Sequence, residues 1–148
     1  MSKDQKLITA KTLLFGELVN YIGAKQRSRI ADILHGAERE CMAGILIELA
    51  ERIKKAPVTY QTDGQGRNAV AWLHYFAGSS ANWWITELDV DAAHQWALDD
   101  YDQAFGVANL FGHSANDGEL GYISIKELIE NGAEMDLFWT PKAIKELR

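Results

Sequence analysis

Carboxylates gathered in one short stretch are the side chains of this sequence most suited to chemistry. The stretch runs from Glu87 to Asp102 and also contains a tryptophan; its candidate residues are Glu87, Asp89, Asp91, Trp96, Asp99, Asp100 and Asp102. Carboxylate oxygens bind Mg²⁺ or Ca²⁺, but the spacing does not match an EF-hand loop. A solvated acidic loop is the simplest interpretation, and a protein-docking surface or a metal site are the alternatives. We expect a functional loop and assign no metal to it.

Histidine and cysteine offer little support for a metal or a nucleophile. A zinc site would have to join His94 and His113 across the sheet with Asp117 or Glu119, and no HExxH spacing supports this. Cys41 lies among apolar residues of helical spacing, which predicts a small core residue. No catalytic residue, cofactor or metal is assigned, and the sequence is interpreted as that of a non-enzymatic protein.

Aromatic residues form the second unusual feature. Trp83 and Trp84 are adjacent, so on a strand they must point to opposite faces of the sheet. If helices cover one face, the other Trp lies in the open or in a groove, where tryptophan serves protein binding or base stacking. The alternative is that Trp83 and Trp84 are both covered in the core. Of the tryptophans named here, Trp96 is the one we most expect to be exposed.

Charge divides the chain at Pro57. Residues 1–57 carry ten Lys and Arg against seven Asp and Glu, a net charge of +3, and the remainder carries five against fourteen, a net charge of −9. From Asn68 to Ile125 there is no Lys or Arg. Such a surface repels phosphates and attracts a basic protein surface. Direct contact with nucleic acid would have to use the N-terminal third, through Lys25, Arg27 and Arg29.

The cellular compartment is predicted from sequence features that we do not find. No apolar run approaches the roughly 20 residues that a membrane-spanning helix needs, and the N-terminus has no apolar stretch typical of a signal peptide. A single cysteine cannot form an internal disulfide. We therefore expect a cytoplasmic protein without membrane contact.

Periodicity predicts helices in residues 1–57 and strands in residues 58–148, as one compact unit of 148 residues. Apolar residues recur at helical spacing over about 6–22, over a short stretch from Ser28, and most clearly over 41–53, before Pro57. Short β-type runs follow at 69–76, 82–88, 103–111, 120–123 and 134–139. These patterns indicate an α+β fold with N-terminal helices packed on a mostly antiparallel sheet of four to five strands.

Two helix starts are predicted inside the second half. Ser124-Ile-Lys-Glu127 has the spacing of a capping box. Thr140-Pro141 places proline at a first helical position.

Four segments in this half resemble a known group. They are Phe76-Ala-Gly-Ser-Ser-Ala-Asn-Trp-Trp-Ile-Thr-Glu87, Gln103-Ala-Phe-Gly106, Glu119-Leu-Gly-Tyr-Ile-Ser-Ile-Lys-Glu-Leu128 and Met135-Asp-Leu-Phe-Trp-Thr-Pro141. Their order resembles an uncharacterised domain family carried by plasmids, conjugative elements and phages, over about residues 69–147. The resemblance implies a role on a mobile element and transfers no catalytic residues.

Charge and this context together predict an accessory protein that binds and inhibits or modulates a host nucleic-acid-handling defence complex, of the anti-CRISPR or anti-restriction type. Its acidic, Trp-bearing surface would occupy a basic surface of that complex. Two alternatives remain: a nucleic-acid-binding accessory in plasmid or phage maintenance or transfer, and a metal-dependent hydrolase using the acidic loop with His94 or His113.

Overall fold

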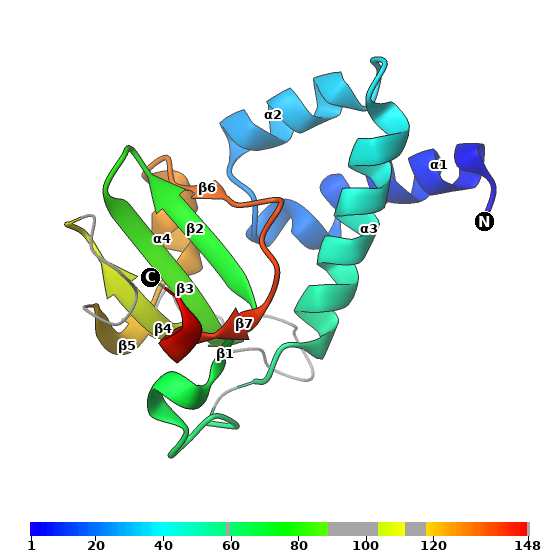
Figure 1. Cartoon of the computed structure of the whole chain (residues 1–148). Helices are drawn as coiled ribbons and strands as arrows, with labels where there is room; N and C mark the ends of the chain where they lie inside the picture. The colour runs from blue at the N-terminus through cyan, green and yellow to red at the C-terminus, as the bar shows by residue number, and fades with distance from the viewer. Residues whose placement is uncertain (59, 89–103, 112–117, 148) are drawn as a thin grey trace.

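The computed structural model describes residues 1–58, 60–88, 104–111 and 118–147. Figure 1 shows an α-helical N-terminal third beside a twisted sheet, with the C-terminus lying against the sheet. The predicted α+β class with N-terminal helices and a mostly antiparallel five-stranded sheet is confirmed.

Three helices make up the N-terminal third. Their bounds are α1 Lys3–Leu14, α2 Ala24–Ile33 and α3 Arg39–Lys55. Helix α1 begins with a capping box, in which the Ser2 hydroxyl accepts from the Gln5 backbone N–H and the Gln5 side chain accepts from the Ser2 N–H. Helix α3 ends two residues before Pro57, as the sequence predicts.

The predicted helix over 6–22 is divided in two. The α-helix ends at Leu14, and a 3-10 helix over Glu17–Asn20 follows. Gly16 lies at the break, where a Cβ would stand only 2.7 Å from the Thr12 carbonyl oxygen. The chain can therefore turn at this point only because glycine has no side chain.

The sheet has the order β5-β4-β3-β2-β6, and every neighbouring pair is antiparallel. Its strands are β2 Leu73–Ala77, β3 Ala81–Leu88, β4 Ala104–Asn109, β5 Glu119–Ile123 and β6 Glu134–Met135. A separate two-stranded sheet pairs β1 Val70–Ala71 with β7 Lys142–Ala143. The predicted meander is thus present, and the last strand of the larger sheet lies on its far side beside β2.

The sheet is covered on both faces. One face packs against α1, α2 and α3 in a core that includes Leu73, Tyr75 and Ile85, with Trp83 packed against it. On the other face Trp84 packs in a second cluster with Ile144, close to the C-terminus. The opposite orientations of Trp83 and Trp84 are confirmed, and both rings are covered because the C-terminal segment occupies the face that the helices leave open.

Two buried polar contacts join the helical third to the sheet. The Gln26 side-chain amide donates to the Met135 carbonyl at 2.8 Å and accepts from the Met135 N–H at 2.9 Å, so it pairs with β6 much as a further strand would. The Tyr75 hydroxyl donates to the Tyr21 carbonyl at 2.6 Å. Burial raises the pKa of both tyrosine hydroxyls well above the ordinary value, which keeps Tyr75 protonated as a donor.

The two helix starts predicted in the second half have different outcomes. Helix α4 spans Ile125–Glu130, and the Ser124 hydroxyl accepts from the Glu127 N–H as predicted. The prediction at Thr140-Pro141 is wrong, because β7 begins at Lys142 and only a 3-10 turn over Ile144–Glu146 follows. Pairing of this segment with β1 overrides the local preference of proline for a helix start.

The helices of the described ranges all fall short of the length or the apolar content that a membrane span requires.

Gly106 marks the closest approach between two strands. A Cβ built on Gly106 would lie 1.9 Å from the Trp84 carbonyl oxygen of β3. Its partner in register across β4 and β5 is Gly121, where a Cβ would meet nothing within 4 Å. These two glycines therefore form a matched pair for mutation.

We expect Gly106→Ala to lower the free energy of unfolding by about 3 kcal/mol or more, because β3 and β4 must separate to admit the methyl group. Gly121→Ala should change it by less than about 1 kcal/mol. Urea denaturation of both variants measures this, and equal stabilities would show that the close approach at Gly106 is not a constraint.

Candidate protein-binding surface

The acidic segment, which we define as residues 89–102, connects two neighbouring strands of the sheet, β3 and β4. Strand β3 ends at Leu88 and β4 begins at Ala104, and these two residues are partners in register. The residues on either side of this segment therefore lie next to each other on paired strands. Most of the predicted binding residues lie outside the described residues, namely Asp89, Asp91, Trp96, Asp99, Asp100 and Asp102.

Glu87 does not lie on the surface, and its prediction as a binding residue is wrong. It is 5% exposed, and its carboxylate accepts from the Tyr60 N–H at 2.8 Å, from the Thr62 N–H at 3.1 Å and from the Thr62 hydroxyl. The strand register shifts between Ile85 and Glu87, which is a β-bulge. A bulge changes the direction of the side chains that follow it, and Glu87 is directed at the segment 60–62.

The segment before the sheet is fixed to the end of β3 by further contacts. The Leu88 N–H donates to the Pro57 carbonyl at 2.9 Å, and Val58 forms a parallel bridge with Leu88. The Val58 N–H donates to the Gln61 side chain at 2.8 Å. Together with Glu87 these contacts make a hydrogen-bonded base, which we call the loop base, at the point where the acidic segment starts.

Tyr60 has an unusual backbone at this base. Its φ is +67°, and it is the one non-glycine residue with positive φ in the described chain. The left-handed region costs a bulky residue on the order of 1–2 kcal/mol. The Glu87 carboxylate receives the Tyr60 N–H, and the tyrosine side chain is 62% exposed. The structure thus holds a strained backbone that presents an aromatic ring to solvent.

A pocket of about 370 Å³ lies beside the loop base. Val58 and Leu88 line it together with side chains of α3 and of the chain between α1 and α2; those residues are Gly16, Glu17, Leu18, Asn20, Tyr21, Ala50, Ile53, Lys54 and Ala56. Helix and sheet therefore meet in a hollow next to the start of the acidic segment.

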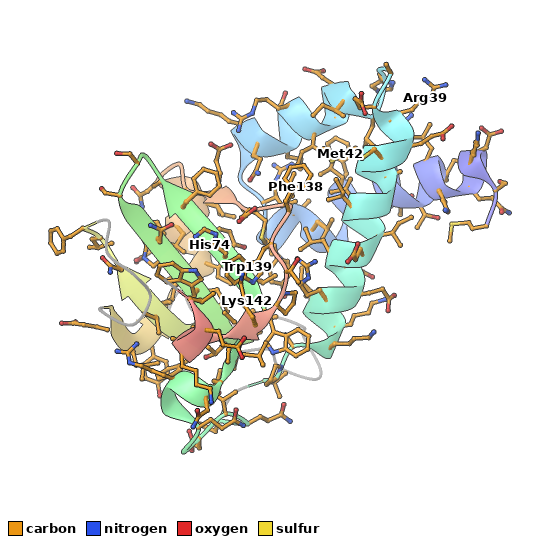
Figure 2. All side chains as sticks on the ribbon, viewed as in Figure 1. Arg39, Met42, His74, Phe138, Trp139 and Lys142 are labelled. Atoms are coloured by element: carbon orange, nitrogen blue, oxygen red, sulfur yellow. The ribbon has the colours of Figure 1, made fainter. Side chains whose placement is uncertain are left out.

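His74 is the centre of a polar and aromatic cluster on the sheet face opposite α1–α3. Its Nδ1 lies 3.0 Å from Asp136 Oδ2, and its Nε2 lies 2.8 Å from Asn82 Oδ1. The ring stacks on Trp84 at 5.3 Å and tilts against Trp139 at 5.1 Å, with Lys142 Nζ over the Trp139 ring. Figure 2 shows His74, Trp139 and Lys142 together on this side. Both ring nitrogens are engaged, so His74 joins β2, β3 and the C-terminal segment.

Asp136 also shapes the turn that follows β6. Its Oδ1 accepts from the Phe138 N–H at 3.1 Å, and its backbone N–H donates to the His74 carbonyl at 2.8 Å. The bond between the Phe138 N–H and the Asp136 side chain forms an Asx turn. Phe138, labelled in Figure 2, follows this turn, and its side chain is largely exposed.

The three basic residues proposed for phosphate contact differ in availability. They line a surface pocket of about 630 Å³ between the start of α2 and the α4–β6 connection. Arg27 Nη1 donates to the Ile22 carbonyl at 2.8 Å, and Arg29 forms an ion pair with Glu134. Lys25 is exposed. Two of the three cations are thus used within the fold, which weakens the nucleic-acid alternative.

The metal and nucleophile candidates gain no support from the described geometry. His94, His113 and Asp117 lie outside the described residues. In the remaining ranges no three His, Cys, Asp or Glu side chains lie close enough to hold a metal ion. Cys41 is exposed, which corrects its predicted core position. The buried stripe of α3 begins one residue later, at Met42, so Cys41 falls on the solvent side.

Comparison with known proteins gives no relative. No protein-family model matches the chain, and no curated protein or solved structure is similar to it.

Sequence reasoning missed the internal partners of this region. Thr62 and Glu87 are 25 residues apart, and His74 and Asp136 are 62 apart, so neither contact falls within a periodic pattern. The adjacent Trp-Trp pair and the turn residues around 60–68 were the available signals. They indicate a strand and a turn, but not which polar side chain joins them.

We expect Glu87→Ala to lower the free energy of unfolding by about 3 kcal/mol, because two backbone N–H groups and the Thr62 hydroxyl lose their acceptor in a buried site. Glu119→Ala, an exposed carboxylate on β5, should change it by less than about 0.5 kcal/mol. Urea denaturation at neutral pH is the measurement. Equal effects of the two substitutions would contradict the assigned role of Glu87.

Proposed function

We propose that this protein is a binding protein, not an enzyme, that inhibits or modulates a host nucleic-acid-handling complex by occupying its basic surface. The contact surface consists of the acidic segment, with Asp89, Asp91, Asp99, Asp100 and Asp102, and Trp96 as an aromatic anchor. The exposed Tyr60 ring at the loop base extends this surface.

The attachment of the acidic segment is the observation that supports the proposal most. It starts and ends on two paired central strands, and the loop base fixes the chain at its start. Binding loops in proteins are commonly held in this way by a rigid scaffold. A fixed base lowers the conformational entropy that the loop loses on binding, so more of the interaction energy becomes affinity.

Charge supplies the selectivity. From Asn68 to Ile125 the chain has no Lys or Arg, so the charged side chains of the two strands and of the segment between them are predominantly carboxylates. Proteins that hold nucleic acid have basic channels, and a negative surface is attracted to such a channel before contact. The attraction raises the association rate and excludes acidic partners.

Tyr60 adds a described residue to this surface. A bulky residue in the left-handed region costs stability, and such strain persists where the surrounding contacts impose it, often at functional sites. The Glu87 carboxylate imposes it here, and the result is an exposed aromatic ring beside the acidic segment. Tyrosine and tryptophan are the residues most enriched among binding hot spots.

Affinity capture tests the acidic surface. Wild type should retain a basic nucleic-acid-binding complex from host lysate, and added double-stranded DNA should displace that complex because both compete for one surface. Asp99→Lys/Asp100→Lys/Asp102→Lys should lose at least about tenfold in affinity for the purified partner, since each reversal replaces an attraction by a repulsion.

The matched control is Glu51→Lys/Glu127→Lys/Glu130→Lys, which makes the same change in net charge at exposed positions on α3 and α4, away from the loop base. It should keep most of the capture. If both triple variants lose the same affinity, the effect arises from net charge and not from the acidic segment. If DNA does not displace the captured complex, the protein does not occupy a nucleic-acid-binding surface.

The Tyr60→Gly variant tests the backbone strain at residue 60 and the contact of its aromatic ring by two separate measurements. Glycine adopts positive φ without the steric cost, so the free energy of unfolding should stay equal or rise by up to about 1 kcal/mol. The ring is lost, so affinity for the captured partner should fall about tenfold or more. Tyr60→Phe keeps the ring and should keep most of the affinity. If Tyr60→Gly binds as wild type does, the ring is not part of the surface.

A further inference from the structure

Helix α1 carries apolar side chains on its solvent side. Ile8 lies within the helix and Phe15 at its end, and they are 65% and 61% exposed. They are spaced by seven residues, which is two turns of helix, so they form one stripe, which we call the outer stripe. Met1 precedes the extended N-cap residue Ser2, and its Sδ lies 3.8 Å from the Thr9 hydroxyl, beside the stripe.

The opposite side of α1 is already in use. Ala10 and Leu14 are buried and Leu7 packs against the same core, while α1 packs mainly on α3. A helix with apolar residues on both sides is normally covered on both. Figure 1 shows α1 extending past α3, away from the sheet.

We propose that the outer stripe is a self-association surface, on which α1 packs antiparallel against α1 of a second copy of this chain about a two-fold axis at Ile8. In this arrangement Ile8 contacts Ile8 of the second copy. Phe15 of each copy then lies against the first turn of α1 of the other copy.

Charges beside the stripe favour the antiparallel orientation. At 100° per residue Asp4 and Lys11 lie on one flank of Ile8, and Gln5 and Thr12 lie on the other. The two-fold axis places Asp4 of each chain beside Lys11 of the other, which gives two ion pairs, and Gln5 beside Thr12. Asp4 is exposed and Lys11 is half-buried at the edge of the stripe.

A neighbouring cation cannot replace Lys11. Lys3 lies on the α3 side of the helix, where its ammonium group forms an ion pair with Glu40. A parallel pairing would set Asp4 level with Asp4 of the second copy and leave both flanks without opposite charges. The pattern therefore selects a second copy of this chain in the antiparallel orientation over an unrelated helix.

The length of α1 sets the strength of this contact. Its 12 residues extend about 18 Å, and a pair of such helices buries less than the roughly 1,200–2,000 Å² of a stable interface. We therefore expect a reversible dimer with a Kd on the order of tens of micromolar. Monomer should dominate in dilute solution and dimer at high concentration.

Sedimentation equilibrium of the full chain from about 5 to about 500 µM tests the proposal. The average mass of wild type should rise toward twice that of one chain. Ile8→Asp places a charge on the axis and should keep the chain monomeric throughout. Its circular dichroism and unfolding midpoint show whether it stays folded.

Charge exchange identifies the orientation. Asp4→Lys and Lys11→Asp should each weaken self-association about tenfold, because each creates two like-charge contacts. An equimolar mixture of these two variants should recover the wild-type mass. In the mixed dimer the lysine introduced into one chain meets the aspartate introduced into the other, and the unchanged Lys11 meets the unchanged Asp4. Lys6→Asp, an exposed reversal away from the stripe, should leave association unchanged.

Three results would overturn the proposal. A wild-type chain that stays monomeric at about 500 µM has no such surface. A dimer that Ile8→Asp does not disturb is formed elsewhere. A mixture of Asp4→Lys and Lys11→Asp that stays as weak as either variant alone excludes antiparallel pairing of α1, and recovery in the mixture cannot arise from a change in folding alone.

Discussion

The rest of the structure depends on the burial of the last five residues of β3. Five consecutive residues, Trp84–Leu88, are at most 6% exposed. One face of this strand packs on the helices, the other packs on the C-terminal segment, and both of its edges are paired. A strand buried in this way stabilises every element that contacts it, because each contributes apolar area removed from water at roughly 25 cal/mol per Å². Gly106 permits the close approach of β4, and Trp84 supports the C-terminal segment.

A polar group inside this strand connects stability to function. Glu87 is part of the buried run, and a carboxylate can stay there only with its hydrogen bonds satisfied. Thr62 and the Tyr60 backbone supply them, and in return the segment 57–62 is fixed against the end of β3. The same contacts impose the strained backbone of Tyr60 and define where the acidic segment starts. The hydrogen bonds of Glu87 thus stabilise the scaffold and also position the start of the proposed binding surface.

The two halves of the molecule use their surfaces differently. The second half concentrates negative charge and has no Lys or Arg from Asn68 to Ile125, which suits contact with a basic partner. The helical third has mixed charges and an apolar stripe on α1, which suits weak self-association. Gln26 and Tyr75 hold these halves together through buried hydrogen bonds, so a partner on one side and a second copy on the other would act on one rigid framework.

The sequence by itself determined the α+β class, helix α3, the strands of the meander and the opposite orientations of Trp83 and Trp84. Each of these follows from a period of two or of 3.6 residues within a short window. Only the tertiary structure decided that Glu87 is buried, that Cys41 is exposed, that Arg29 pairs with Glu134, and that the C-terminal segment covers the second face of the sheet. Local periodicity gives the direction of a side chain relative to its neighbours, whereas burial of a charge depends on donors that arrive from distant parts of the chain, as Thr62 does at Glu87.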